Sequence, residues 1–135
     1  SVRNIEVTGE FVCNLATWDT REKMNKSSTT LPPESDEIVL SGLTAMPSEI
    51  VNAPRIKEAP VHLECRYLKS VDIPGWNEKD AYRVIFGEVV GIHINDEFIT
   101  EEGLVDVIKM LAIGRLGYGD YTRVDSESIF SMNRP

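Results

Sequence analysis

The segment Val61–Tyr67 (VHLECRY) decides the fold class, because its side chains alternate strictly between apolar and polar. The odd positions are apolar or aromatic, whereas the even positions are His62, Glu64 and Arg66. A period of two residues is typical of a half-buried β-strand. We therefore predict one long strand that begins at Val61 and continues to Ile73.

A second long strand is predicted over residues 81–94 (AYRVIFGEVVGIHI). Its even positions are apolar except for Glu88, and its odd positions include Ile85 and Val89. A strand that is apolar on both faces is usually covered on both sides. An unpaired buried carboxylate is costly, so we expect Glu88 to be a buried acid with hydrogen-bond partners.

The rest of the chain predicts shorter elements around these two strands. Capping residues and apolar spacing favour helices over residues 1–8, 17–25, 36–41 and 100–111. Short strands are expected at residues 10–16, 97–99 and 129–132, an irregular segment at 43–60, and a Gly-rich loop at 115–121. The sum favours a mainly β protein with peripheral helices, built as one domain over residues 1–135.

Composition excludes several classes of partner. The chain has 135 residues and a net charge of −8, from 22 acidic and 14 basic residues. An acidic surface repels nucleic acid and anionic membranes. Cys13 and Cys65 lie in apolar runs, so we expect two free buried thiols, a reducing compartment and a cytoplasmic location.

Motifs for metal binding or side-chain catalysis are missing from the sequence. The two histidines and two cysteines lack the spacing of metal ligands, so no metal site is predicted. No G-x-G-x-x-G follows a strand, which argues against a Rossmann cofactor site. No set of a serine, a histidine and an acid is identifiable, and we assign no catalytic residue.

Five segments, taken in order, resemble flavin reductase-like proteins. They are SVRNIEVTGEFVCNL (1–15), GLTAMPSEIV (42–51), APVHLECRYL (59–68), FGEVVGIHI (86–94) and RLGYGDY (115–121). The resemblance implies an FMN-binding split β-barrel that forms a homodimer. The family domain begins before the segment that matches Ser1, so we expect this chain to be the C-terminal portion of that domain, incomplete at the N-terminus.

The resemblance assigns the first cofactor contacts to Ser1 and Asn4. The amides at a helix N-terminus, together with the Ser1 hydroxyl, can hold the FMN phosphate. The alternative for Ser1 is a plain N-cap. Asn4 matches the asparagine of the family's helix, and it either touches the ligand or stabilises the same loop.

The second set of contacts is Arg115, Gly117, Tyr118 and Tyr121 in RLGYGDY. Glycine permits close approach of backbone to a flat ring, tyrosine can stack, and arginine can offset negative charge. The family usually has glycine where this chain has Tyr118. In the alternative interpretation Tyr121 is core, Arg115 pairs with a surface acid and the glycines only make turns.

His93 is the candidate for a nucleotide contact, since related reductases use a histidine near this region. The alternative is a solvated histidine or one with partners in the core. The resemblance implies an FMN-binding oxidoreductase that takes a hydride from NAD(P)H. Two alternatives are a flavin-binding module without turnover and a dimerisation module that has lost the flavin.

Overall fold

The computed structural model describes residues 2–29, 36–76 and 82–135. The chain forms two compact units, each assembled from three segments. Unit 1 comprises Ser1–Cys13, Met46–Arg55 and His62–His93, and unit 2 comprises Asn14–Ala45, Ile56–Val61 and Ile94–Pro135. The assignment of residues 1–135 to one domain stays a prediction.

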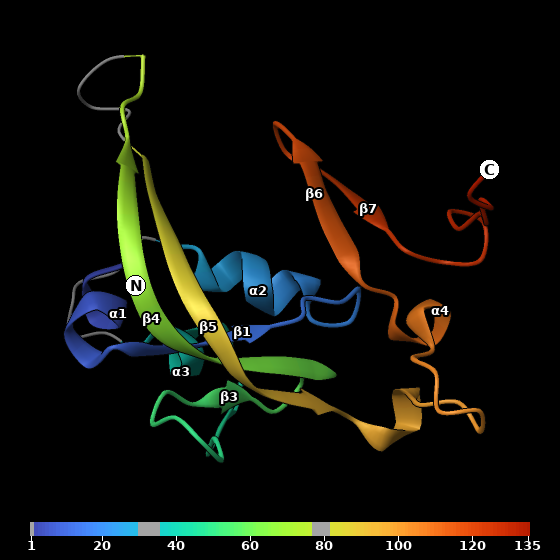
Figure 1. Cartoon of the computed structure of the whole chain (residues 1–135), viewed down its shortest axis with the longest axis horizontal. Helices are drawn as coiled ribbons and strands as arrows, with labels where there is room; N and C mark the ends of the chain where they lie inside the picture. Colours follow the sequence, from blue (N-terminus) through green and yellow to red (C-terminus); the bar gives the residue numbers. More distant parts are fainter. Residues whose placement is uncertain (1, 30–35, 77–81) are drawn as a thin grey trace. The chain divides into compact units, whose positions relative to one another are not determined.

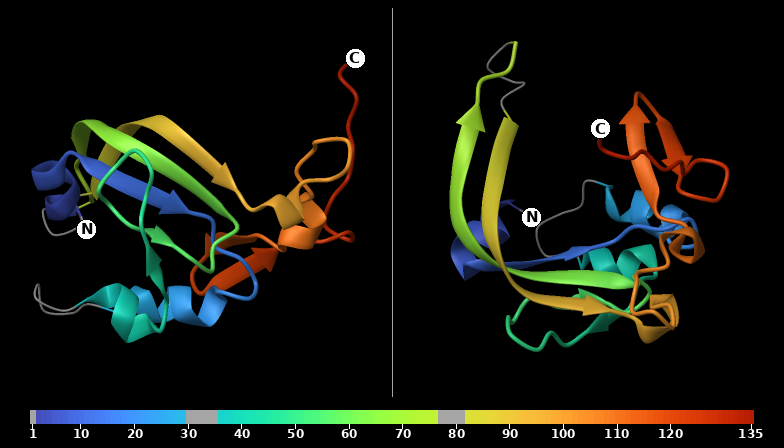
Figure 2. Two further views of the ribbon diagram at one scale, coloured as in Figure 1. Left: turned by 90° about the horizontal axis from the view of Figure 1, so that it is seen from below. Right: turned by 45° about the vertical axis from the view of Figure 1, so that its right-hand side comes forward.

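Unit 1 is built on the two long strands that the sequence predicts. They are β4 (Val61–Ile73) and β5 (Tyr82–Ile94), and they form a three-stranded sheet with β1 (Glu10–Asn14) in the order β1-β4-β5. Figures 1 and 2 show β4 and β5 running side by side and curving together. Both long strands are thus confirmed, with Ala81 outside the described residues.

The helix α1 (Val2–Thr8) leads into β1 through Gly9. Gly9 has a φ of 73° and donates its N–H to the carbonyl of Ile5 at 2.8 Å. Glycine adopts this left-handed conformation without the steric cost of a Cβ. The carbonyl of Gly9 in turn accepts the N–H of Tyr67 at 2.8 Å, so the end of the helix is joined directly to β4.

A close approach between β1 and β5 depends on Gly87. A Cβ at Gly87 would lie 2.5 Å from Cζ of Phe11 and 3.1 Å from the carbonyl oxygen of Arg66. The Phe11 ring therefore lies against bare β5 backbone. Only glycine leaves room for it, because interiors are packed to the density of organic crystals.

The first half of β4 is buried on its polar side as well as on its apolar side. His62 is 6% exposed, Glu64 0% and Cys65 3%. The interpretation of β4 as half-buried is therefore wrong for this half. The expectation of a buried acid at Glu88 is also wrong, because Glu88 is exposed and Glu64 takes that role.

Unit 2 contains short helices and a hairpin. Its elements are α2 (Arg21–Ser27), α3 (Glu37–Ser41), the 3-10 helix η2 (Asp96–Phe98), α4 (Val107–Met110), β6 (Ile113–Gly117) and β7 (Asp120–Arg123). The predicted helix at 36–41 is confirmed from Glu37, with Asp36 as its N-cap. The irregular segment 43–60 contains one small sheet, made of β2 (Ala45–Met46) and β3 (Arg55–Ile56).

The helix predicted over residues 17–25 begins later than expected. Thr17 pairs with Ala112 as an isolated β-bridge, and the hydroxyl of Thr20 accepts the N–H of Thr17 at 3.0 Å. These bonds hold residues 17–20 in a turn, so α2 starts only at Arg21. A threonine side chain that bonds local backbone competes with helix in this way.

The helix predicted over residues 100–111 is mostly wrong. Gly103 has a φ of 78°, and Ile99 pairs with Val105 as a β-bridge. A true helix, α4, starts only after Asp106, whose side chain accepts the N–H of Lys109 at 2.9 Å. The predicted strand at 97–99 is replaced by η2, and the one at 129–132 has no strand structure.

Both cysteines are free, but only Cys65 is buried, so the expectation of two buried thiols fails for Cys13. Burial, followed by the neighbouring Cys13, raises the pKa of the Cys65 thiol. Among the described residues, no group of three or more metal-ligating side chains is arranged to hold a metal ion. The helices in this part of the chain are all too short or too polar to cross a membrane.

Candidate functional site

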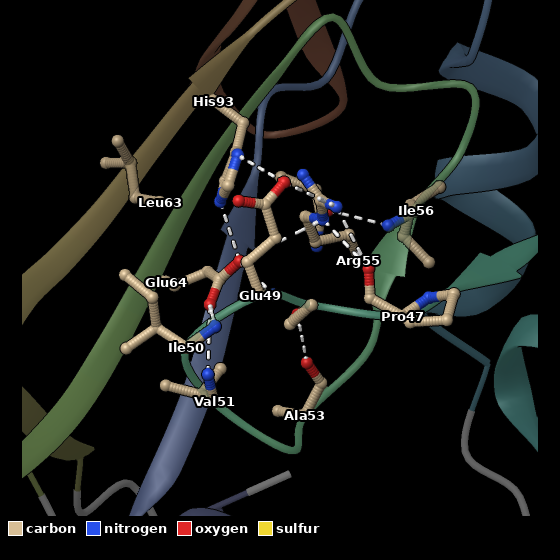
Figure 3. Close-up of polar contacts among 12 residues, drawn as sticks. Pro47, Glu49, Ile50, Val51, Ala53, Arg55, Ile56, Leu63, Glu64 and His93 are labelled. Atoms are coloured by element: carbon tan, nitrogen blue, oxygen red, sulfur yellow. Dashed lines mark hydrogen bonds and ion pairs between the residues drawn. The ribbon is translucent and has the colours of Figure 1, made fainter.

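The carboxylate of Glu64 in unit 1 has four hydrogen-bond partners (Figure 3). It accepts backbone N–H groups from Glu49 at 2.9 Å, Ile50 at 2.7 Å and Val51 at 3.0 Å. Its Oε1 atom also lies 2.7 Å from Nε2 of His93. A single β4 residue therefore fixes three consecutive amides of the segment that follows β2.

These bonds determine the protonation of Glu64. Burial acts to raise its pKa, but the hydrogen bonds from Glu49, Ile50, Val51 and His93 outweigh burial and lower the pKa to about 2. Hydrogen bonds to the charged form favour ionisation. The carboxylate is therefore charged at neutral pH although it is completely buried.

Arg55 supports the same segment from the other side. Its Nε and Nη2 atoms donate to the carbonyl of Pro47 at 3.1 and 3.0 Å, and Nε lies 4.0 Å from Oε1 of Glu64. Arg55 is only 8% exposed. The buried positive charge of Arg55 offsets the negative charge of Glu64. The main role of the cluster is therefore to fix the backbone of residues 47–55.

His93 belongs to this cluster. Its Nε2 faces Glu64, and its Nδ1 lies 3.6 Å from Oε1 of Glu49. The side chain is 19% exposed. The structure therefore gives His93 the core partners that formed the alternative in the sequence analysis, and the predicted nucleotide contact stays a prediction.

Of the two predicted contacts in α1, the structure describes only Asn4. Ser1 lies outside the described residues. Asn4 is exposed on α1, and its carbonyl accepts the hydroxyl of Thr8 at 2.9 Å. Asn4 is in unit 1, whereas the other predicted cofactor contacts, Arg115 to Tyr121, are in unit 2.

The segment RLGYGDY is a β-hairpin rather than the predicted loop. Strand β6 pairs antiparallel with β7, with Arg115 opposite Tyr121 and Gly117 opposite Asp120. The connection is the pair Tyr118-Gly119. Arg115 donates from Nη2 to the carbonyl of Tyr118 at 3.2 Å, so its side chain folds back over the turn.

Tyr118 is held in an unusual conformation at this turn. It has a φ of 52°, and it is 100% exposed. Positive φ at the first central residue of a two-residue hairpin turn is the place where glycine is favoured. A bulky residue there is strained, and strain of this kind clusters at functional sites. A Cβ at Gly117 or Gly119 would meet no atom within 4 Å, so the turn backbone is open to a flat ligand.

One of the predicted contacts, Tyr121, lines a pocket. This pocket, called the Trp18 pocket below, has a volume of about 270 Å³, and its lining includes Trp18, Arg21, Met24, Tyr121 and Arg123. The guanidinium carbon of Arg21 lies 3.9 Å from the centroid of the Trp18 ring, and that of Arg123 lies 5.0 Å away. The hairpin and α2 thus build one concave site within unit 2.

Sequence reasoning missed Trp18, Arg21 and Arg123. The signal for them was weak, because Trp18 stands about a hundred residues before Arg123 in the chain. The β-bridge between Thr17 and Ala112 brings the segment of Trp18 next to the start of the hairpin. Such a long-range pairing cannot be predicted from a single sequence.

Comparison with known proteins places this geometry in a family. Residues 1–113 match the model of the flavin reductase like domain. A protein of Aquifex aeolicus without an assigned function is 38% identical over 127 residues, which cover 94% of this chain and 62% of that protein.

Two solved structures combine strong structural likeness with moderate identity. Component B of nitrilotriacetate monooxygenase from Bacillus cereus has a TM-score of 0.86 at 27% identity, covering 97% of this chain and 63% of that one. The 2-nitrobenzoate 2-nitroreductase NbaA of Pseudomonas fluorescens has a TM-score of 0.81 at 27% identity, covering 99% and 64%.

The chain spans less than two thirds of the length of its curated relatives, 63% and 62% for the first two. A structure titled as a putative flavin reductase with a split-barrel domain, from Shewanella frigidimarina, has a TM-score of 0.81 at 18% identity and supports the fold alone. With 113 of its 135 residues matched, the chain belongs to the flavin reductase-like family and has that family's mainly β, split-barrel fold.

Proposed function

We propose that this chain is part of an FMN-dependent oxidoreductase whose flavin is reduced by NADH or NADPH. The observation that carries the proposal is the family match over residues 1–113, which include α1 and both long strands. The two solved relatives at 27% identity are named as a monooxygenase component and a nitroreductase, and both names denote redox proteins.

The residues of the hairpin fit a flavin. The open backbone at Gly117 and Gly119 allows a flat ring to approach, and Tyr118 presents a fully exposed ring beside it. Arg115 lies over the turn, where its positive charge suits an anionic ligand. We assign Arg115, Gly117, Tyr118 and Tyr121 to the flavin, and Ser1 and Asn4 to its phosphate.

The flavin would supply the redox chemistry by accepting a hydride and passing electrons on. The protein then has to bind and orient its ligands, and it needs no acid or base of its own. This agrees with the role of Glu64, which is ionised and enclosed by protein donors and so shapes the fold.

The proposal is tested with the full-length protein and FMN. Binding should give a protein-bound yellow chromophore that bleaches without oxygen when NADH or NADPH is added. A yellow protein that does not bleach would instead be a flavin-binding module without turnover. A protein that stays colourless after incubation with FMN would contradict the proposal. The remaining alternative would then be a dimerisation module that has lost the flavin.

We also propose that the protein is a homodimer. The ribbon formed by β4 and β5 exposes large apolar side chains, among them Leu68 at 61%, Tyr82 at 67% and Ile92 at 64%. Exposed apolar patches usually mark an interface. Light scattering should give twice the mass of the chain at micromolar concentration, and charged substitutions such as Ile92→Glu should shift the mass toward that of one chain.

A further inference from the structure

We propose that the Trp18 pocket binds the phosphate-bearing adenosine end of the nicotinamide dinucleotide. This inference rests on the proposed function, which requires such a donor. It adds a binding site for the adenosine end of NADH or NADPH, which is remote from the nicotinamide that donates the hydride. The pocket lies wholly within unit 2, and α2 and the β6–β7 hairpin both contribute to it.

The first argument is the arrangement of positive charge around an aromatic ring. Arg21 and Arg123 both lie over Trp18, at 3.9 and 5.0 Å from its centroid. Cation–π attraction holds each guanidinium near the ring and so limits its freedom before a ligand arrives. Preorganised guanidinium groups are the usual protein partners of phosphate.

The second argument is that hydrogen-bond donors remain. Arg123 uses Nε and Nη2 to bind Oδ2 of Asp125, at 3.1 and 2.9 Å. Arg21 uses Nη1 to bind the carbonyl of Trp18, and its Nε lies 3.5 Å from Glu22. A guanidinium has five N–H donors. Within the part of the chain that the structure describes, Nη1 of Arg123 and Nη2 of Arg21 therefore have donors left for a phosphate.

Two acids oppose the arginines to different degrees: Glu22, which also lines the pocket, and Asp125, which binds Arg123. Glu22 is 80% exposed along its side chain, so it can turn away into solvent. Asp125 is held in place, because its Oδ1 also accepts the N–H groups of Glu127 and Ser128 at 3.2 Å. We therefore expect Arg21 to be the principal phosphate donor, with Arg123 fixed by Asp125 as the second.

The third argument is size and polarity. The pocket has an apolar wall that includes Trp18 and Met24. Tyr121, which the proposed function assigns to the flavin, also lines it and is 44% exposed, so the flavin and the adenosine end would share this residue. Its volume of about 270 Å³ is below the range of roughly 300–1,000 Å³ that drug-sized ligands occupy. One aromatic base with its phosphate fits this description, whereas a complete dinucleotide does not.

The test is calorimetric titration of the full-length protein with adenosine 2′,5′-bisphosphate, 5′-AMP and unphosphorylated adenosine. The phosphorylated probes should bind with a quench of tryptophan emission that Trp18→Phe abolishes. Arg21→Gln should raise the dissociation constant about tenfold, which corresponds to roughly 1.4 kcal/mol, because it removes a charge-assisted hydrogen bond to the phosphate. The dissociation constant of adenosine for the native protein should be at least as high as that of the bisphosphate for Arg21→Gln.

The matched control is Arg66→Gln, which removes an exposed arginine from β4 in unit 1 and should leave the dissociation constant unchanged. Thermal melts of the arginine variants verify that they are folded. In turnover, Arg21→Gln should raise KM for the dinucleotide and leave kcat unchanged.

A separate titration with FMN distinguishes the two proposals. Quenching of Trp18 by FMN, with competition against adenosine bisphosphate, would overturn the inference and support a flavin site in this pocket. Unchanged binding of adenosine 2′,5′-bisphosphate in Arg21→Gln and Arg123→Gln would overturn it as well. Binding of the bisphosphate that depends on these arginines, in a protein that binds no flavin, would contradict only the proposed function.

Discussion

The Nε2 atom of His93 on β5 lies 2.7 Å from Oε1 of Glu64 on β4, and the carboxylate that it meets is completely buried. This pair links the two long strands through their side chains. The same carboxylate also binds the amides of Glu49, Ile50 and Val51. The charge of Glu64 is therefore expected to stabilise unit 1, because it joins two strands and the segment 49–51.

Glu64→Gln should destabilise the protein at neutral pH by about 1–3 kcal/mol, because an amide replaces a charged acceptor of several N–H groups. Urea unfolding measures the change. Glu88→Gln is the control, since Glu88 is exposed and should change the free energy of unfolding by less than about 0.5 kcal/mol. Equal effects of the two substitutions would contradict the assigned role.

The pH dependence of stability should change in the same variant. The pKa of Glu64 is about 2 in the folded protein, against an ordinary value of 4.5. A depressed folded pKa gives stability that is present above the unfolded pKa and lost as the pH falls. The native protein should therefore lose stability between about pH 5 and pH 2 more steeply than Glu64→Gln does. Parallel unfolding curves over this window would be the contrary result.

His93→Ala should be milder than Glu64→Gln, at about 1 kcal/mol, because three backbone donors still hold the carboxylate. His93→Gln should recover part of the loss, since its amide can donate to Glu64. Kinetics of the same variants test the other role. An increase in KM for NAD(P)H in His93→Ala that His93→Gln does not correct would indicate a nucleotide contact.

Gly87→Ala should destabilise by about 1–3 kcal/mol, the usual cost of overpacking. Its methyl group would lie 2.5 Å from Cζ of Phe11. Gly114→Ala is the matched control, because a Cβ there makes an ordinary contact of 3.5 Å with Thr122. Phe11→Leu combined with Gly87→Ala should recover stability, and thermal melts of the four proteins decide the matter.

Tyr118→Gly should stabilise the hairpin by about 1 kcal/mol, because glycine relieves the strain of a positive φ. If Tyr118 contacts the flavin, the same substitution should weaken FMN binding, so stability and affinity would move in opposite directions. Tyr118→Asn retains a side chain that tolerates this conformation. A loss of stability in both variants would show that the turn is not strained.

The long strands were predictable because apolar–polar alternation and β-branched residues persist over many positions. No proline or local turn signal interrupts them. The buried acid was not, since the apolar surroundings in sequence pointed to Glu88, whereas the amides of residues 49–51 bind Glu64. The false helix at 100–111 has a correct apolar stripe, but Gly103 and the Ile99–Val105 bridge bend the chain before it can form. In the candidate site, Tyr121 was predicted from the resemblance of RLGYGDY to the flavin reductase-like family, whereas its neighbours Trp18 and Arg21 depend on a tertiary pairing.

Glu64 fixes the backbone path of residues 49–51 through their main-chain amides and not through their side chains. Main-chain amides are common to every residue except proline, so the three bonds to Glu64 require only that none of positions 49–51 is proline. The side chains carry separate constraints, because Val51 is buried and Glu49 lies 3.6 Å from both Arg55 and His93. The residue that determines the backbone path of this segment, Glu64, lies on β4. Ile50, which is 46% exposed, is accordingly a position where a homologue can change its surface and where a designer can place a new side chain on a fixed backbone.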